Sequence, residues 1–169
     1  MYAAHFAAAL AIKSRVPKAP TWALVTGAFV PDFFWVAFGL AGIEPSQGPA
    51  FFDDWSHSLA MVILWATLFA LAFWRKGVAV FWAVWVAVFS HFVLDLPIHP
   101  KNLALYPHSR LHLGWNLWRI GPRNYWYVQA LVVVVLTLVY VQGARKLRFA
   151  SNLIAASVIL LLGLHVMTW

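Results

Sequence analysis

The sequence predicts an all-α integral membrane protein, folded as a single domain over residues 1–169 with a bundle of five to six transmembrane helices. Composition is the first reason. Hydrophobic residues make up 63% of the chain and charged residues 10%, and the mean hydropathy is +0.77. A soluble domain typically has about 25% charged residues. The second reason is distribution, because the few charges fall between long apolar runs, as they do in multi-span membrane proteins.

Six apolar segments are candidates for the transmembrane helices. A helix needs roughly 17–25 residues to cross the hydrocarbon layer of a bilayer. Five segments reach that length, and the first does so only if its helix continues through Lys13 and Arg15, with both side chains extending to the interface. In chain order the segments are Met1–Ile12, Thr21–Ile43, Phe51–Trp74, Val78–Leu96, Tyr125–Val141 and Ala150–Trp169.

Charge placement predicts the orientation of these helices. Alternate loops are basic, and Lys and Arg favour the cytoplasmic side of a bacterial inner membrane. The loop over residues 41–54 is acidic and has no cation, so we expect it to face outward together with the His-rich loop over residues 97–123, although that loop also has four cations. The basic clusters are Lys13, Arg15 and Lys18; Arg75 and Lys76; and Arg145, Lys146 and Arg148.

Two classes of interaction are excluded by composition. The net charge of +7 comes without a basic stripe interleaved with aromatic residues, so we expect the lipid bilayer as a partner and no nucleic acid. The chain has no cysteine, which excludes disulfides and thiolate metal sites.

Ionisable residues from separate segments are predicted to lie at one depth, near the outer ends of their helices. Asp32 is nearer the middle of its segment, but the preceding Pro31 removes a backbone donor and predicts a kink that would tilt Asp32 toward the others. An ionisable group at such a depth is costly unless it is paired, so it marks a candidate functional site. The remaining members of this set are His5, His57, His91, Asp95 and His99.

These residue types indicate a metal site without thiolates. His91 and Asp95 are four residues apart and share one helix face. Imidazole and carboxylate groups bind Zn²⁺, Mn²⁺ or Fe²⁺, and a bound ion of this kind lowers the pKa of its water to about 7, which suits hydrolysis of an ester or phosphoester. The alternative for His91 and Asp95 is a structural hydrogen bond that stabilises the bundle.

Other polar residues have simpler interpretations. Ser56 and Ser58 flank His57 and are typical of helix N-caps, and Ser56 is the expected cap. His108 and His112 are expected to be interfacial loop residues. His165 is expected to pack against its neighbours, with ligation of a haem or a pigment left open.

Four stretches of the chain also carry a resemblance to known proteins. "MYAAHFAAALAIK", "DDWSHSLAM", "SHFVLDLPIHPKNLALYP" and "LGWNLW" resemble, in matching order over about the first 120 residues, an uncharacterised family of small bacterial multi-span membrane proteins. More distantly the pattern is similar to the YdjM-type inner-membrane metal-dependent hydrolases, whose ligand order resembles that of zinc-dependent phospholipase C. The resemblance implies a zinc-type hydrolase site formed by His5, Asp32, His57, His91 and Asp95.

The chain departs from these patterns at several positions. Where the resemblance would place further ligands, this chain has Phe34, Phe52 and Asn102, and Pro100–Lys101 replaces an Arg-Pro pair. Loss of three ligands favours a single metal ion, or a site that has lost its activity, over a binuclear centre.

Two hypotheses of function follow. In the first, the chain is a membrane-embedded metal-dependent hydrolase that acts on a lipid-like ester or phosphoester at the outer face. His5, His57, His91 and Asp95 are then ligands, with His99 as a further candidate, and Asp32 is a ligand or the general base. In the second, the chain is a non-catalytic accessory subunit of a larger electron-transfer or photosynthetic membrane complex, with a degenerate metal site. A transporter is a third and weaker hypothesis.

Overall fold

The structure, a computed structural model, describes residues 2–45, 53–99 and 103–167. Within these ranges the chain is helical and has no β-strand, apart from an isolated bridge between Ala104 and His112. The predicted all-α class is therefore confirmed. The α-helices are α1 (Tyr2–Lys13), α2 (Thr21–Gly27), α3 (Val30–Leu40), α4 (Asp54–His57), α5 (Leu59–Leu71), α6 (Val78–Asp95), α7 (Pro122–Lys146) and α8 (Ser151–Val166), and two short 3-10 helices are η2 (Trp74–Lys76) and η3 (Leu117–Ile120).

Fewer helices are long enough to span a bilayer than the apolar segments suggest. By length and composition α6 and α7 qualify, and α2 with α3 adds a third if the pair, bent by 52°, is one broken span. The apolar helices α5 and α8 have 13 and 16 residues, or about 20 and 24 Å at 1.5 Å per residue. The structure thus supports two to three candidate spans, and a bundle of five to six spans stays a prediction.

The predicted third segment divides into two helices. Its first two residues lie outside the described ranges, and the rest forms α4 and α5, which meet at Ser58 in an extended conformation (ψ 151°). The loop that follows α6 holds the start of α5, because the backbone N–H groups of Leu59 and Ala60 donate to the carbonyl oxygens of Ala104 and Leu105, both at 3.0 Å.

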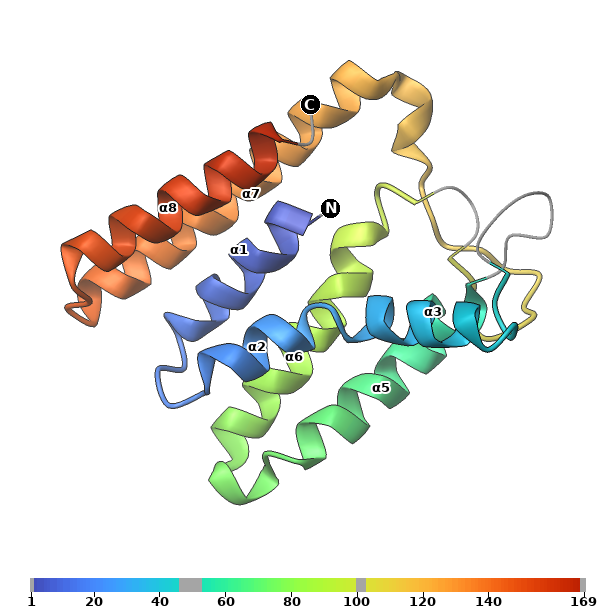
Figure 1. Ribbon diagram of the computed structural model, residues 1–169, viewed down its shortest axis with the longest axis horizontal. Coiled ribbons are helices and arrows are strands. Elements are labelled where there is room, and N and C mark those ends of the chain that lie inside the picture. The colour runs from blue at the N-terminus through green and yellow to red at the C-terminus, as the bar shows by residue number, and fades with distance from the viewer. Residues whose placement is uncertain (1, 46–52, 100–102, 168–169) are drawn as a thin grey trace.

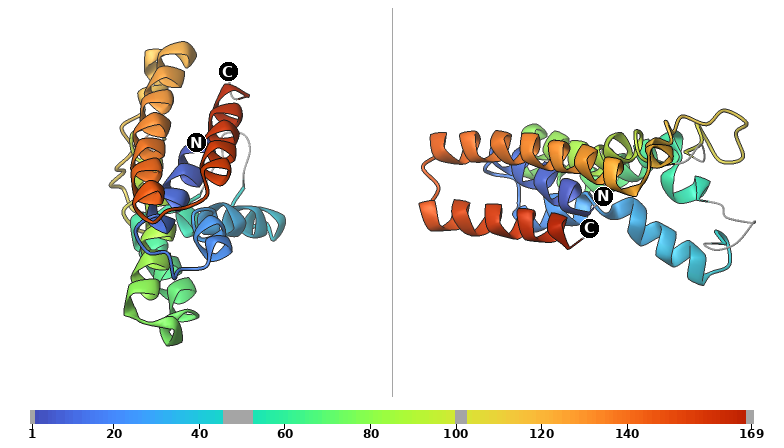
Figure 2. Two further views of the ribbon diagram at one scale, coloured as in Figure 1. Left: turned by 90° about the vertical axis from the view of Figure 1, so that its left-hand side faces the viewer. Right: turned by 90° about the horizontal axis from the view of Figure 1, so that it is seen from above.

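Helix α1 lies between two helical hairpins, α5–α6 and α7–α8 (Figures 1 and 2). Its small side chains permit close packing on several neighbours at once. Ala3 and Ala4 pack with Val133 of α7, and Ala11 packs with Tyr140 two turns further along the same helix, so α1 and α7 run parallel.

The three basic clusters, at residues 13–18, 75–76 and 145–148, lie together at one end of this arrangement, whereas Arg119 of η3 and Arg123 of α7 lie at the other. Lys13 is at the end of α1, close to Ser14, which contacts Gly143 near the end of α7. Arg75 and Lys76 belong to η2, between α5 and α6, and this turn shares a hydrophobic core with the α1–α2 loop through Phe73 and Ala19. The opposite ends of α1, α6 and α7 are therefore free to form a polar site.

The contact between Ser14 and Gly143 supports a first prediction. A Cβ atom at residue 143 would lie 2.7 Å from the Ser14 Cβ and 3.0 Å from its carbonyl oxygen, whereas a Cβ at Gly163 of α8 would meet nothing within 4 Å. We expect Gly143→Ala to destabilise the fold by about 1–3 kcal/mol and Gly163→Ala to leave it unchanged or slightly more stable. Thermal unfolding of both variants in detergent measures this. Equal melting temperatures would contradict the close approach of α1 to α7.

Candidate metal centre

All six predicted site residues line one cleft with a volume of about 250 Å³. They come from four helices and the turn after α6. The cleft lies at the end of the molecule away from the three basic clusters, where α1 begins and α6 ends. Its ionisable residues are His5 of α1, Asp32 of α3, His57 of α4, His91 and Asp95 of α6, and His99; Asp53 also faces it.

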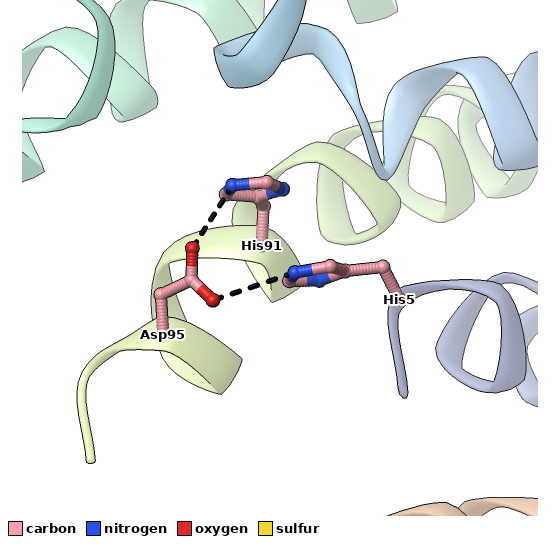
Figure 3. A group of neighbouring side chains, drawn as sticks. All are labelled: His5, His91 and Asp95. Atoms are coloured by element: carbon pink, nitrogen blue, oxygen red, sulfur yellow. Dashed lines mark ion pairs between the residues drawn. The ribbon is translucent and has the colours of Figure 1, made fainter. Parts of the chain in front are cut away.

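The deepest part of the cluster is built around Asp95 (Figure 3). The Nε2 atom of His91 lies 3.0 Å from Asp95 Oδ2, and the Nε2 atom of His5 lies 3.4 Å from Asp95 Oδ1. The His5 and His91 rings are stacked, with centroids 4.2 Å apart. All three side chains are buried, so the pairing of their charges has a large effect on the energy of the fold.

Asp32 forms the more open side of the cluster. Its Oδ1 atom is 3.5 Å from His57 Nε2 and 3.6 Å from His91 Nε2. The Asp32 side chain is 33% exposed, against 1% for His91. His99 is more peripheral, because its Nε2 atom lies 3.7 Å from Asp95 Oδ2 and its side chain is 27% exposed.

A break between α2 and α3 positions both Asp32 and His91. The two helices meet at an angle of 52°. Pro31 is at the start of α3, where a missing N–H is tolerated, so the predicted interruption is confirmed. Asp32 falls in the first turn of α3. The Ala28 carbonyl at the break accepts a hydrogen bond from His91 Nδ1 at 2.7 Å.

This hydrogen bond determines the tautomer of His91. A carbonyl oxygen only accepts, so Nδ1 of His91 must have the proton. In the neutral ring Nε2 then has a lone pair, and it points toward the carboxylates of Asp95 and Asp32. Metal-binding histidines are oriented in the same way by a backbone carbonyl behind the ring.

His57 is oriented in a similar way. The Ser56 hydroxyl donates to the Asp53 carbonyl at 3.0 Å, so at its 2.7 Å contact with His57 Nδ1 it accepts. Nε2 of His57 therefore also presents a lone pair, toward Asp32. The expectation that Ser56 is an N-cap is wrong, because Ser56 lies inside α4 and fixes the His57 ring. Ser58 has the N-cap position of α5 and makes no side-chain cap hydrogen bond.

Lone pairs that face carboxylates need a cation between them, either a proton or a metal ion. Charge-assisted N–H···O hydrogen bonds are about 2.7–2.9 Å long, and four of the five histidine–carboxylate distances are 3.4 Å or more. Ligand atoms around a tetrahedral zinc-type ion are separated by roughly 3.3–3.5 Å, given metal–ligand bonds of about 2.0–2.2 Å. The observed spacing therefore fits an ion better than a set of hydrogen bonds.

Two overlapping triads could hold such an ion. In each triad one ligand atom per residue lies within 4.8 Å of the others. The triads share His91, whose Nδ1 is already bonded to Ala28, so its single free nitrogen can bind one ion only. The triads are His5, His91 and Asp95, and Asp32, His57 and His91.

The structural role of the acidic loop was not predicted from the sequence. Glu44, Asp53 and Asp54 were expected on an outward-facing loop, but all three are buried, at 0%, 2% and 6% exposure. Glu44 Oε1 accepts from the backbone N–H groups of Trp55 and Ser56 at 2.6 and 2.9 Å, which anchors the start of α4. With five acids in 169 residues, the scarcity of carboxylates was the available signal that each has a specific role.

The remaining histidines lie outside the two triads. The His108 backbone donates to Asp54 Oδ2 at 2.7 Å, and His112 is an exposed loop residue. His165 is buried and stacks on Trp126, with ring centroids 4.4 Å apart, which agrees with the expected packing role.

Of the positions where the chain departs from the metal-dependent hydrolase pattern, Phe34 stacks on Trp65 with ring centroids 3.9 Å apart. Phe52 and residues 100–102 lie outside the described ranges. The aromatic contact gives Phe34 a packing role, in accord with a single-ion site.

No family model matches the chain, and no curated protein or solved structure matches it. The resemblance to small bacterial membrane proteins and to the YdjM-type hydrolases therefore stays a prediction from sequence motifs. The candidate site rests on geometry alone.

Asp53 supports a prediction about pH. Burial, together with the nearby charges of Asp54 and Glu44 and against the effect of His57, raises the pKa of Asp53 from 3.8 to about 7. The folded chain thus binds this proton more tightly than the unfolded chain, so the free energy of unfolding falls as pH rises from about 4 to about 7. We expect Asp53→Asn, which cannot titrate, to show a smaller fall. Thermal unfolding across this range tests it, and parallel curves for the variant and the wild type would contradict a buried Asp53.

Proposed function

We propose that the chain is a membrane-embedded, metal-dependent hydrolase that cleaves a lipid-like ester or phosphoester, with its cleft open to the outer face of a bacterial inner membrane. One observation carries the proposal. His91 has its Nδ1 atom bonded to Ala28 and its Nε2 atom buried 3.0 and 3.6 Å from two carboxylates. A neutral histidine in that position repels both carboxylates unless a cation lies among them.

A single divalent ion suits this cluster by charge. Asp32 and Asp95 bring two negative charges, which one Zn²⁺, Mn²⁺ or Fe²⁺ neutralises, while neutral imidazoles supply further ligands. We assign the triad of His5, His91 and Asp95 to hold the ion, with His57, from the triad that includes Asp32, as a further candidate ligand. When bound, an ion of this kind polarises an ester or phosphoester oxygen and supplies a nucleophile at neutral pH.

Asp32 is proposed as the general base. Its carboxylate is the more exposed of the two in the cluster and faces the cleft, where substrate and water enter. Its Oδ1 atom lies 3.5 and 3.6 Å from the Nε2 atoms of His57 and His91, so Oδ2 is the oxygen left to accept a proton. A general base must lie within hydrogen-bond reach of the proton that it removes, and Asp32 is placed to take one from a water in the cleft at its Oδ2 atom.

A membrane location accords with the distribution of apolar and basic residues. Two to three helices are apolar enough to span a bilayer. The basic clusters at residues 13–18, 75–76 and 145–148 gather at the end away from the cleft, which the positive-inside rule favours as the cytoplasmic end, whereas Arg110, Arg119 and Arg123 lie on the cleft side. This arrangement supports an outward-facing cleft.

The alternative, a non-catalytic accessory subunit, would have a plugged cluster and a long apolar face against its partners. Exposed leucines and valines on α7 and α8 suit a partner protein, but they suit lipid equally well. The 250 Å³ cleft at the cluster and the partial exposure of Asp32 favour the hydrolase. A transporter has no comparable support from the described residues.

The metal is the first point to test. We expect elemental analysis of the detergent-purified protein to give one Zn, Mn or Fe per chain, and His91→Ala to lose it, because both triads need His91. His112→Ala, at an exposed loop histidine, is the matched control and should keep the ion. Chelation should lower the melting temperature of the wild type, since an ion that binds only the folded state stabilises it.

A wild-type protein without any metal, after purification in metal-supplemented buffer, would overturn the hydrolase proposal. His91 would then be doubly protonated and paired with Asp95 as a structural contact.

Catalysis by Asp32 is tested separately. We expect Asp32→Asn to retain the ion and to lower kcat by about 10²–10⁴, the usual contribution of a general base, with Asp32→Glu partly active. Steady-state hydrolysis of p-nitrophenyl esters and phosphodiesters gives kcat, and elemental analysis of the same samples gives metal content. Unchanged kcat in Asp32→Asn would exclude the role of base.

A further inference from the structure

We infer that an apolar groove beside the cleft holds an acyl chain of the substrate, so that the substrate is a membrane lipid that enters sideways from the bilayer. This inference rests on the proposed hydrolase function and adds the substrate class and the position of its chain. The groove has a volume of about 490 Å³. Its walls come from α1, α2, α3 and α8 and include Tyr2, Phe6, Val25, Phe29, Phe33 and Leu164.

The groove adjoins the cleft. Tyr2 lines both. Phe29 forms the wall between them, since its ring meets the edge of the His5 ring at a centroid distance of 5.6 Å and packs on Phe6 at 4.8 Å. One aromatic side chain, Phe29, therefore separates His5 from the groove. A ligand whose polar group lies at His5 can place its apolar chain in the groove.

The chemistry of the two spaces matches an amphiphilic ligand. The cleft has four imidazoles and three carboxylates, whereas the residues described along the groove are apolar or aromatic except for Thr26 and the Tyr2 hydroxyl. Tyr2 and Phe33 are 63% and 57% exposed, so the groove is open along its side. An apolar chain can thus enter from surrounding lipid while its ester group stays at the polar cleft.

A second apolar groove provides a useful comparison. It has a volume of about 350 Å³ and lies between α3 and α5, with Phe33, Phe34 and Trp65 in its walls. It shares Thr26 and Phe33 with the first groove, but no residue described along it also lines the cleft. Of these two grooves only the first shares a lining residue with the cleft, so we assign the acyl chain to it.

The groove is expected to act on specificity more than on affinity. Lipid tails are as apolar as the groove walls, so a chain gains little hydrophobic free energy by leaving the bilayer. Its benefit is orientation, because a chain held in the groove places the ester near the catalytic residues. Long-chain esters should therefore be favoured in kcat/KM.

Photolabelling tests occupancy without relying on hydrolysis. The probe is palmitic acid with a terminal diazirine, and labelled positions are mapped by mass spectrometry on the full chain in detergent. We expect labels on groove residues, and we expect Val25→Trp, which fills the groove, to reduce them by about tenfold, the lower end of what an apolar pocket discriminates. Val134→Trp, at a 44% exposed residue of α7, is the matched control and should label as the wild type does. Leu164→Trp replaces Val25→Trp if the latter does not fold.

The same variants test specificity. We expect Val25→Trp to lower the ratio of kcat/KM for long-chain over short-chain p-nitrophenyl esters by about tenfold. Labels spread over the outer faces of α7 and α8, or labelling unaffected by both groove variants, would overturn the inference. Failure of the hydrolase proposal would give a different result. No ester would be cleaved at any chain length, but the groove would still be labelled in both the wild type and His91→Ala.

Discussion

The hydrogen bond from His91 Nδ1 to the Ala28 carbonyl is the interaction on which the site depends. It exists because α2 ends at Gly27, which leaves the next carbonyl free to face α6. Gly27 also permits the approach, since a Cβ there would already be 3.4 Å from Ala87 and Val88 of α6. The same break starts α3 and brings Asp32 into the cluster. One irregularity in the backbone thus fixes a histidine tautomer, the direction of its free nitrogen, and the position of a carboxylate.

Helix ends add a second, independent reason for a cation at this place. Asp95 and His91 lie in the last two turns of α6, where the helix dipole is negative and disfavours a carboxylate. Asp32 lies in the first turn of α3, where the dipole favours one. Asp95 is therefore the less stable of the two carboxylates as a bare anion, and its burial adds to the cost. A positive charge beside Asp95 offsets both effects. His5 and His91 are the side chains that could supply this charge by protonation or bind a metal ion that supplies it.

The helical class, the interruption near Pro31 and the convergence of six residues were accessible from the sequence, because they follow from apolar segment lengths and from the depth of ionisable groups in those segments. The role of Glu44 was not. Its carboxylate accepts from Trp55 and Ser56, more than ten residues away, and a contact between a side chain and a distant backbone leaves no periodic signal. The division of α4 from α5 has the same origin, since the 103–105 loop that holds Leu59 and Ala60 is remote in sequence.

The number of spans could not be predicted for a different reason. Apolar length indicates that a segment avoids water, but it does not distinguish a segment surrounded by lipid from one surrounded by protein. Helix α1 is the clearest case, with 12 residues and small side chains buried against α2, α6, α7 and α8. The described helix is about 18 Å long at 1.5 Å per residue, and its small side chains pack against other helices. These contacts have a consequence for the site, because they place the first turns of α1 at the level where α6 ends, and His5 meets Asp95 there.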